Sequence, residues 1–443
     1  MQAELPRLRA KETSLRYAEI AAESGFPVMG IKGPTILAAL FGFDVSKSVI
    51  PDAMHCCWLG IVVQFRKLWE TSTDKQFYIQ NMSKRIDKYL CGIKVPNDVT
   101  RVPRSMEIFG SDWKASENRT FCLFISPVVL MDLLPEQYYD HWMLFVNGCR
   151  LLLKKPVTEE NRKIASKLFD KFIFLVPSLY GDENVSYNVH ILQHIPEAVK
   201  YWGAPWATSA FLFEDAGGDL IHQFHGTRYV AEQIFSNFLS KAKLKRYSKS
   251  YIENADEDVR KVFESFNHVV PSAGDEIKLL GKGRSELLDY QMQSALDEYF
   301  EANFGEICTC DTLSLYERVS LKGKVYSTDN YCANLQRDDS IVQLHSTVVC
   351  FIKKIAQISH SPTCMVNHSV LVIGEKLEAL PVRSHVDTHS GIDLTHFIKK
   401  VDRVRRIPTF VVFSPFEIKN KCVRIGNDGG NFILSYDVNV ERG

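Results

Sequence analysis

Two short segments of the sequence carry side chains whose types and spacing suit acid–base or metal chemistry. Asp52 and His55 are three residues apart, so both can lie on one face of a helical turn, where the carboxylate fixes the imidazole tautomer or both groups approach a metal ion. Glu214 directly follows an apolar run that ends at Phe213, a position where active-site acids often lie. Each has a structural alternative, because Asp52 and Glu214 would also serve as helix caps.

Two further candidates favour structural interpretations. His190 and His194 are four residues apart on one helical face, but Ile191 occupies the position where metalloproteases carry a glutamate, and Pro196 disrupts the helix nearby. A metalloenzyme that uses this histidine pair is therefore the least favoured function. The segment Gly281–Lys282–Gly283 places a lysine between two glycines but lacks the longer glycine-spaced loop of a phosphate cradle, which indicates a turn.

The 11 cysteines are scattered, and no two have the CxxC spacing of a structural zinc site. A zinc site would have to combine Cys308, Cys310 and Cys332, whereas free thiols in a reducing compartment are the simpler interpretation. The N-terminal segment is polar, unlike a signal peptide, and no run of 18 apolar residues is present. We therefore expect an intracellular chain without a membrane span.

The charge pattern gives limited support to nucleic-acid binding. The formal net charge is zero, with 53 basic and 53 acidic residues, whereas DNA-binding domains are usually basic. One dense basic stretch lies between residues 241 and 249 and includes Lys243, Lys245 and Arg246. These side chains either contact phosphate groups or form the solvated end of a helix.

More than one domain must position these residues, because 443 residues exceed a single ordinary core. Apolar residues recur at helical spacing through residues 56–205, which predicts an all-helical domain. The apolar run 206–213 is short enough for a buried strand or an extended entry, and a helix that buries Phe238 is expected over about 227–239. Short apolar runs separated by turn residues then predict a small β-rich barrel or sandwich.

Several segments resemble, in order and approximate spacing, the transposases of the CACTA (En/Spm-like) group, especially the animal transposase-domain proteins. The matching segments are Gly30–Thr35, Pro51–Gly60, Trp113–Arg119, Pro127–Leu130, Asn188–His190 with His194, Ser209–Glu214 and His225–Arg228. The β-rich tail also resembles the region that ends many of these proteins. In it, Tyr316, Tyr326 and Tyr331 could line an aromatic site for a peptide or modified lysine, or belong to the core and its rim.

The resemblance implies an RNase H-like catalytic core of the DDE type, in which two aspartates and a glutamate hold two Mg²⁺ or Mn²⁺ ions for DNA strand transfer. The expected fold class is α+β. Residues 1–55 and 206–275 would be remnants of that core, interrupted by the all-helical insertion 56–205. A linker helix over 276–305 and a β-rich domain over 306–443 would follow.

Residue roles follow from the same resemblance. Glu214 would be the third catalytic acid and a metal ligand, while Asp52 and His55 match an accessory Asp-x-x-His string. The candidate DNA-contacting residues are Trp113, Lys114, Arg119, Arg228, Lys243, Lys245 and Arg246. The implied partner is transposon-end DNA, and the implied location is the nucleus.

The departure from the family's pattern concerns activity. In the family both catalytic aspartates, a zinc-knuckle segment and the DNA-end-binding region lie upstream of what corresponds to Met1. One acid of three could not hold two metal ions, so we expect no DNA cleavage by this chain alone. The chain would then be a fragment, a decayed element or a partner of a full-length transposase. The alternative is a domesticated, non-enzymatic nuclear protein that binds DNA or chromatin.

Overall fold

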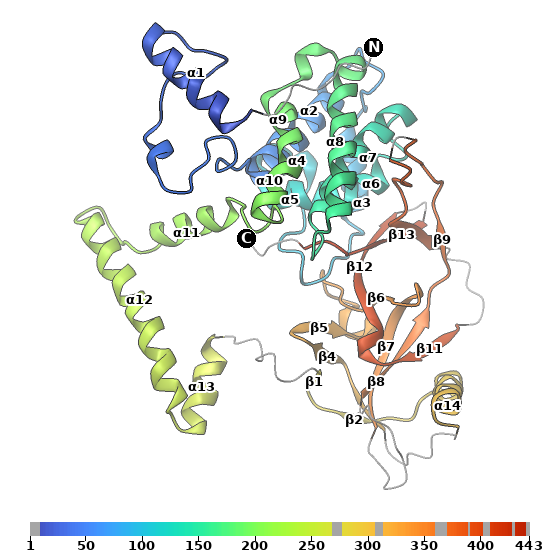
Figure 1. Ribbon diagram of the computed structural model, residues 1–443. Helices are drawn as coiled ribbons and strands as arrows, with labels where there is room; N and C mark the ends of the chain where they lie inside the picture. The colour runs from blue at the N-terminus through green and yellow to red at the C-terminus, as the bar shows by residue number, and fades with distance from the viewer. Residues whose placement is uncertain are drawn as a thin grey trace.

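The computed structural model describes residues 9–267, 277–305, 313–358, 370–388, 390–401, 408–427 and 430–439. Within these ranges the fold is α+β, as predicted (Figure 1). Helices make up the chain as far as residue 267, and antiparallel strands dominate from residue 277 onward. Figure 1 shows a helical bundle above the large sheet, while the helices at 11–24 and 211–267 project to one side.

The bounds of the helices follow the apolar periodicity of the sequence. They are α1 (Lys11–Ser24), η1 (Ile36–Ala39), η2 (Met54–Ile61), α2 (Val62–Thr71), α3 (Met82–Leu90), α4 (Met106–Phe109), η3 (Gly110–Asp112), α5 (Ala115–Thr120), η4 (Phe121–Ile125), α6 (Ser126–Val129), α7 (Glu136–Leu152), α8 (Glu159–Tyr180), η5 (Asp182–Asn184), α9 (Tyr187–Ile191), η6 (Leu192–His194), α10 (Ile195–Trp202), α11 (Phe211–Ile221), α12 (Val230–Glu253) and α13 (Glu257–Asn267). Capping side chains help to set where the helices begin. At the start of α8, for example, the Thr158 side chain accepts a hydrogen bond from the N–H of Asn161.

Aromatic side chains form the centre of the helical part. Trp69 of α2 and Trp142 of α7 meet edge to face, with ring centroids 4.9 Å apart. Phe65 lies one turn before Trp69, and its ring centroid is 5.3 Å from that of Phe172 in α8. All four rings are fully buried. Truncating one such ring to alanine typically costs about 3–5 kcal/mol, so this cluster anchors the bundle.

The strands form two antiparallel sheets. They are β1 (Ile277–Leu280), β2 (Arg284–Ser285), β3 (Leu313–Tyr316), β4 (Arg318–Leu321), β5 (Lys324–Ser327), β6 (Ile341–Leu344), β7 (Val349–Ile358), β8 (Val370–Lys376), β9 (Ala379–Pro381), β10 (Ile398–Val401), β11 (Phe410–Phe413), β12 (Ile418–Asn427) and β13 (Gly430–Ser435). The large sheet has the order β11-β8-β7-β6-β12-β13-β10-β9, with β3 beside β7 and β2 beside β3, and the small sheet has the order β1-β4-β5. The helical pieces among the strands are α14 (Tyr290–Phe304), α15 (Asp329–Cys332) and η7 (Pro415–Glu417).

The small sheet packs against one end of the large sheet. Val319 and Tyr326 of the small sheet share a buried cluster with Ile352 and Val372 of the large sheet. Strand β1 lies in the segment that was expected to be only a linker helix, so the β-rich part begins earlier along the chain than predicted.

The other end of the large sheet belongs to the core of the helical part. Phe397, Ile425 and Leu434 lie in the same buried cluster as the aromatic side chains of the helices. The Asn147 side chain in α7 donates a hydrogen bond to the carbonyl of Leu394 over 2.9 Å. The helical part and the β-rich part are therefore packed together through one continuous core.

Two predictions from apolar runs are wrong. Residues 206–213 do not form a buried strand, because a turn leads directly into α11 and Phe213 is exposed. The following helix, α12, is longer than predicted, and Phe238 is 56% exposed instead of buried. Apolar residues on α11 and α12 thus face solvent on a segment that projects from the bundle (Figure 1).

The N-terminal residues 9–55 do not form part of a sheet, although a remnant of an RNase H-like core was expected there. Residues 9–55 contain α1 and η1, and their only described β pairing is an isolated bridge between Val28 and Ile31. Among the described residues, no helix is both long enough and apolar enough to cross a bilayer.

Candidate functional site

His55 lies between two carboxylates. Its Nδ1 is 2.6 Å from Oδ2 of Asp52, and its Nε2 is 3.4 Å from Oε1 of Glu214. The structure therefore brings together the two accessory residues and the third acid that the resemblance implied. The side chains of His55 and Glu214 are 58% and 59% exposed, so the attraction between them is weakened by water.

Asp52 positions both of its neighbours. Its Oδ2 accepts a hydrogen bond from the backbone N–H of His55 over 3.0 Å, which caps the start of η2. Its Oδ1 accepts from the backbone N–H of Ala210 over 2.9 Å, immediately before α11. Asp52 therefore acts as a helix cap, which was the structural alternative considered for it. It also fixes the start of α11, the helix that carries Glu214.

Arg119 holds α11 from the other side. Its guanidinium carbon lies 4.8 Å from the ring centroid of Phe211, the first residue of α11, and its Nη2 donates to the hydroxyl of Thr100 over 3.1 Å. Because Arg119 is buried, its charged group docks one helix on another and does not face DNA in this arrangement.

Another of the resembling segments meets the same region. The Cys56 thiol in η2 donates to the carbonyl of Asn188 in α9 over 3.3 Å. A Cβ atom added to Gly60 would lie 2.5 Å from Nδ2 of Asn188, so only glycine fits there without a shift of its neighbours. The π-helical geometry of η2, which is often found near functional sites, places these residues on the face that meets α9.

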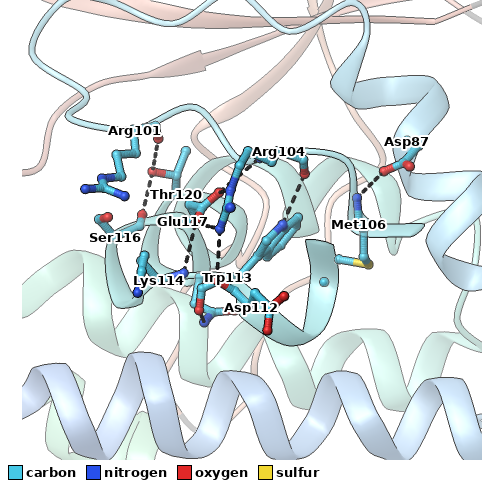
Figure 2. A network of polar contacts seen from close by, with 12 residues as sticks. Asp87, Arg101, Arg104, Met106, Asp112, Trp113, Lys114, Ser116, Glu117 and Thr120 are labelled. Carbon is cyan, nitrogen blue, oxygen red and sulfur yellow. Dashed lines mark hydrogen bonds and ion pairs between the residues drawn. The ribbon is translucent and has the colours of Figure 1, made fainter. Parts of the chain in front are cut away.

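Figure 2 shows that Trp113, Lys114 and Glu117 belong to a network of polar contacts with Arg104. The Glu117 carboxylate accepts hydrogen bonds from the backbone N–H, Nε and Nη2 of Arg104 and from the backbone N–H of Lys114. Trp113 is buried, and its Nε1 donates to the carbonyl of Arg104 over 3.1 Å. The indole is therefore a structural residue and not an accessible DNA contact, and Lys114 is the exposed member of this segment.

The other DNA-contact candidates lie on the projecting segment. Arg228 precedes α12, while Lys243, Lys245 and Arg246 lie within it, and all four side chains are exposed. In the part of the chain that the structure describes, none of the four forms an ion pair with a carboxylate. Their charges are therefore available to an external anion.

Among the described residues, one group of three side chains has the spacing of a metal site, and it consists of Glu136, Asp140 and His385. Glu214 does not belong to it. Its members already have ionic partners, because Nδ1 of His385 lies 2.6 Å from Asp140 and Glu136 lies 3.0 Å from Nη2 of Arg383, which is outside the group. The described residues thus offer Glu214 an imidazole neighbour but no set of acids for two Mg²⁺ or Mn²⁺ ions.

The remaining sequence candidates have structural surroundings. The rings of His190 and His194 meet edge to face with centroids 5.5 Å apart, and burial together with the charge of His190 lowers the pKa of His194. Lys282 lies in the loop between β1 and β2, next to Gly281 with a φ of 95°. Cys332 is buried, whereas Cys308 and Cys310 of the alternative zinc site lie outside the described residues.

The three tail tyrosines have separate partners. The Tyr316 hydroxyl donates to Oε1 of Gln357 over 3.0 Å, Tyr326 is buried, and Tyr331 lies 4.9 Å from the guanidinium carbon of Arg318. These contacts fit core and rim positions.

Comparison with known proteins gives no further assignment: no family model, no curated protein and no solved structure matches the chain. The chemistry of the site therefore follows from its own groups. An imidazole between two carboxylates can pass a proton from one side to the other, and the exposed basic side chains of α12, elsewhere on the surface, can bind an anion.

Proposed function

We propose that this chain is a DNA-binding protein of DDE transposase ancestry, of the CACTA type, that does not cleave DNA by itself. The observation that carries the DNA-binding part is the exposed, unpaired basic stretch of α12. Five basic residues and two acidic residues occur in this helix, and Lys243, Lys245 and Arg246 have no carboxylate partner in the part of the chain that the structure describes.

The position of α12 supports a contact with a large polyanion. The helix spans 24 residues, and none of its described side chains is buried. It stands clear of the bundle and the sheets (Figure 1). A helix of this length is about 36 Å long, so a groove of duplex DNA has unobstructed access to its basic half. Lysine and arginine side chains on an open helix neutralise backbone phosphates with little desolvation of buried groups.

The ancestry is supported by the meeting of Asp52 and His55, from the resembling segment Pro51–Gly60, with Glu214, from the resembling segment Ser209–Glu214. The absence of cleavage follows from ligand count, because phosphoryl transfer by two metals needs several carboxylates around one point. Within the described residues, no group of three ligating side chains includes Glu214. A nuclear location and a role on transposon-end or chromosomal DNA are part of the same proposal.

Binding of the full chain to a fluorescent DNA duplex, measured by anisotropy over a series of salt concentrations, tests the proposal. We expect the variant Lys243→Gln/Lys245→Gln/Arg246→Gln to bind more weakly and with a smaller salt dependence. The slope of log K against log salt should fall by roughly 2 to 3, at about 0.9 per phosphate contact.

A matched control removes three exposed lysines from the helical bundle, Lys67→Gln/Lys88→Gln/Lys167→Gln, which also lack a carboxylate partner within the described residues. This control should bind as the unmodified chain does. Equal binding by the α12 variant, or no binding by the unmodified chain, would refute DNA binding through α12. Strand cleavage by the purified chain with Mn²⁺ and terminal-repeat DNA would refute the claim of inactivity.

A further inference from the structure

A cavity of about 440 Å³ lies where the turn after α7 meets the large sheet. One wall is the turn at 154–156, and the opposite wall consists of side chains from β6, β12, β13 and the segment around β10. This size falls within the range of small-molecule sites, and the location is independent of α12. Figure 1 shows the ends of β12 and β13 next to the helical bundle, where this junction lies.

The sheet presents one continuous face to the cavity. Cys422 pairs with Ser435 across β12 and β13, and Ile433 pairs with Lys399 across β13 and β10. Alternate residues on a strand point to the same side, so these side chains share a face. Cys422 and Ile433 are buried and form an apolar floor, while Asn420 donates to the hydroxyl of Ser435 over 3.2 Å.

The charges around the cavity are mostly positive. Lys154, Lys399 and Lys419 line it, and in the described part of the chain none of them forms an ion pair with a carboxylate. Lys155 also lines it, with its Nζ 5.6 Å from the Trp206 ring.

The acid that lines the cavity is already neutralised. Asp437 is ion-paired with the buried Arg150, whose Nη2 also donates to the carbonyl of Ser435 over 2.8 Å. Asp437 therefore does not balance the lysines, and the cavity keeps a surplus of positive charge.

We propose that this cavity binds a nucleotide-sized organic phosphate with more than one negative charge, of the class of a nucleoside diphosphate. The lysine ammonium groups neutralise the phosphates, for which charge-assisted hydrogen bonds are the strongest available contacts. The floor of Cys422 and Ile433 accepts the flat apolar faces of an organic group, and the Asn420 side chain contacts its heteroatoms. A DNA duplex is too wide to enter a cavity of this volume, so the site is distinct from the surface proposed on α12.

Isothermal titration of the full chain with ADP, pyrophosphate and adenosine tests this inference. We expect ADP to bind more tightly than pyrophosphate, and adenosine to bind weakest, because the lysines and the floor each contribute. In the double variant Lys399→Gln/Lys419→Gln, the affinity for ADP should fall by about tenfold or more for each lysine removed.

The control variant Lys167→Gln removes an exposed lysine on α8 and should leave ADP binding unchanged. Thermal unfolding of each variant verifies that it is folded, and DNA binding by the double variant should remain that of the unmodified chain. The inference is overturned if ADP does not bind, if the double variant binds ADP as well as the unmodified chain does, or if single-stranded DNA but not ADP depends on these two lysines.

Discussion

Arg104 and Glu117 form a two-point ion pair in which Nε and Nη2 of the arginine each donate to a different carboxylate oxygen over 2.8 Å. The carboxylate is 1% exposed, whereas the arginine side chain is 42% exposed, so the pair lies at the edge of the helical core. Because the same carboxylate caps the N–H of Lys114, the pair connects the loop at 104 to the start of α5. This segment therefore has a mainly structural role here.

The variant Glu117→Gln should lower the free energy of unfolding by about 2 kcal/mol at pH 7, because a buried acceptor of charge-assisted hydrogen bonds is lost. Burial alone would raise the pKa of Glu117, but the hydrogen bonds from Arg104 and Lys114 bring it below its ordinary value of 4.5. The stabilisation is thus present above that value and is lost as the pH falls through the lower pKa of the folded state. Urea unfolding at pH 7 and at acid pH measures both effects, and the variant of the exposed Glu160, Glu160→Gln, serves as control. An equal loss of stability in the two variants would contradict the stabilising role of the Glu117 carboxylate.

The variant Lys421→Met should destabilise the protein by about 3–5 kcal/mol, since it leaves two carboxylates without their shared cation. Nζ of Lys421 lies 2.7 Å from Asp98 and 2.8 Å from the buried Asp339, so it connects the helical part to the sheet. The exposed Lys400→Met provides the control. Urea unfolding should also show that adding Asp339→Asn to Lys421→Met recovers part of the loss, and no recovery would argue against charge as the cause.

The buried His141 should make stability depend on pH between about 6.5 and 4. Burial lowers the pKa of His141 to about 4, despite the hydrogen bond from its Nε2 to the carbonyl of Phe172. Between these values the unfolded state binds a proton that the folded state does not, so stability falls with falling pH, by about 3 kcal/mol in total. Urea unfolding followed by tryptophan fluorescence should show this slope, and His141→Gln should flatten it.

Asp52 and Glu214 should differ in their effect on stability although both face His55. The variant Asp52→Asn should cost about 1–2 kcal/mol, because the carboxylate accepts from the N–H groups of His55 and Ala210. The variant Glu214→Gln should change stability by less than about 0.5 kcal/mol, because its ion pair is exposed. Unfolding of the two variants in urea compares them directly. A large loss in Glu214→Gln would mean that this carboxylate serves the fold and not a surface site.

The helical part was predictable because its apolar residues recur at a period that buries one face of each helix. Phe65 and Trp69 of α2 and Phe172 of α8 follow that rule and are buried. The rule failed for the segment around Phe213 and for Phe238, because it assumes that an apolar run must be covered, and here the two side chains face solvent on projecting helices. Sequence periodicity reports which residues are apolar, not whether a partner covers them.

The geometry of the candidate site was not predictable from the sequence. Asp52, His55 and Glu214 were selected by spacing and resemblance, yet their meeting depends on the hydrogen bond from Ala210 and on the packing of Arg119 against Phe211. Such long-range contacts leave no local pattern. The Arg104–Glu117 pair was missed for a similar reason, because the polar sequence around Glu117 gives no sign that this carboxylate is buried.

The continuous core has a consequence for the order of events during synthesis. The bundle includes Phe397, Ile425 and Leu434 among its buried residues, and these are translated long after the helices. Until β13 leaves the ribosome, the nascent bundle exposes the surface that these side chains later cover, so it should remain a substrate for chaperones during most of translation.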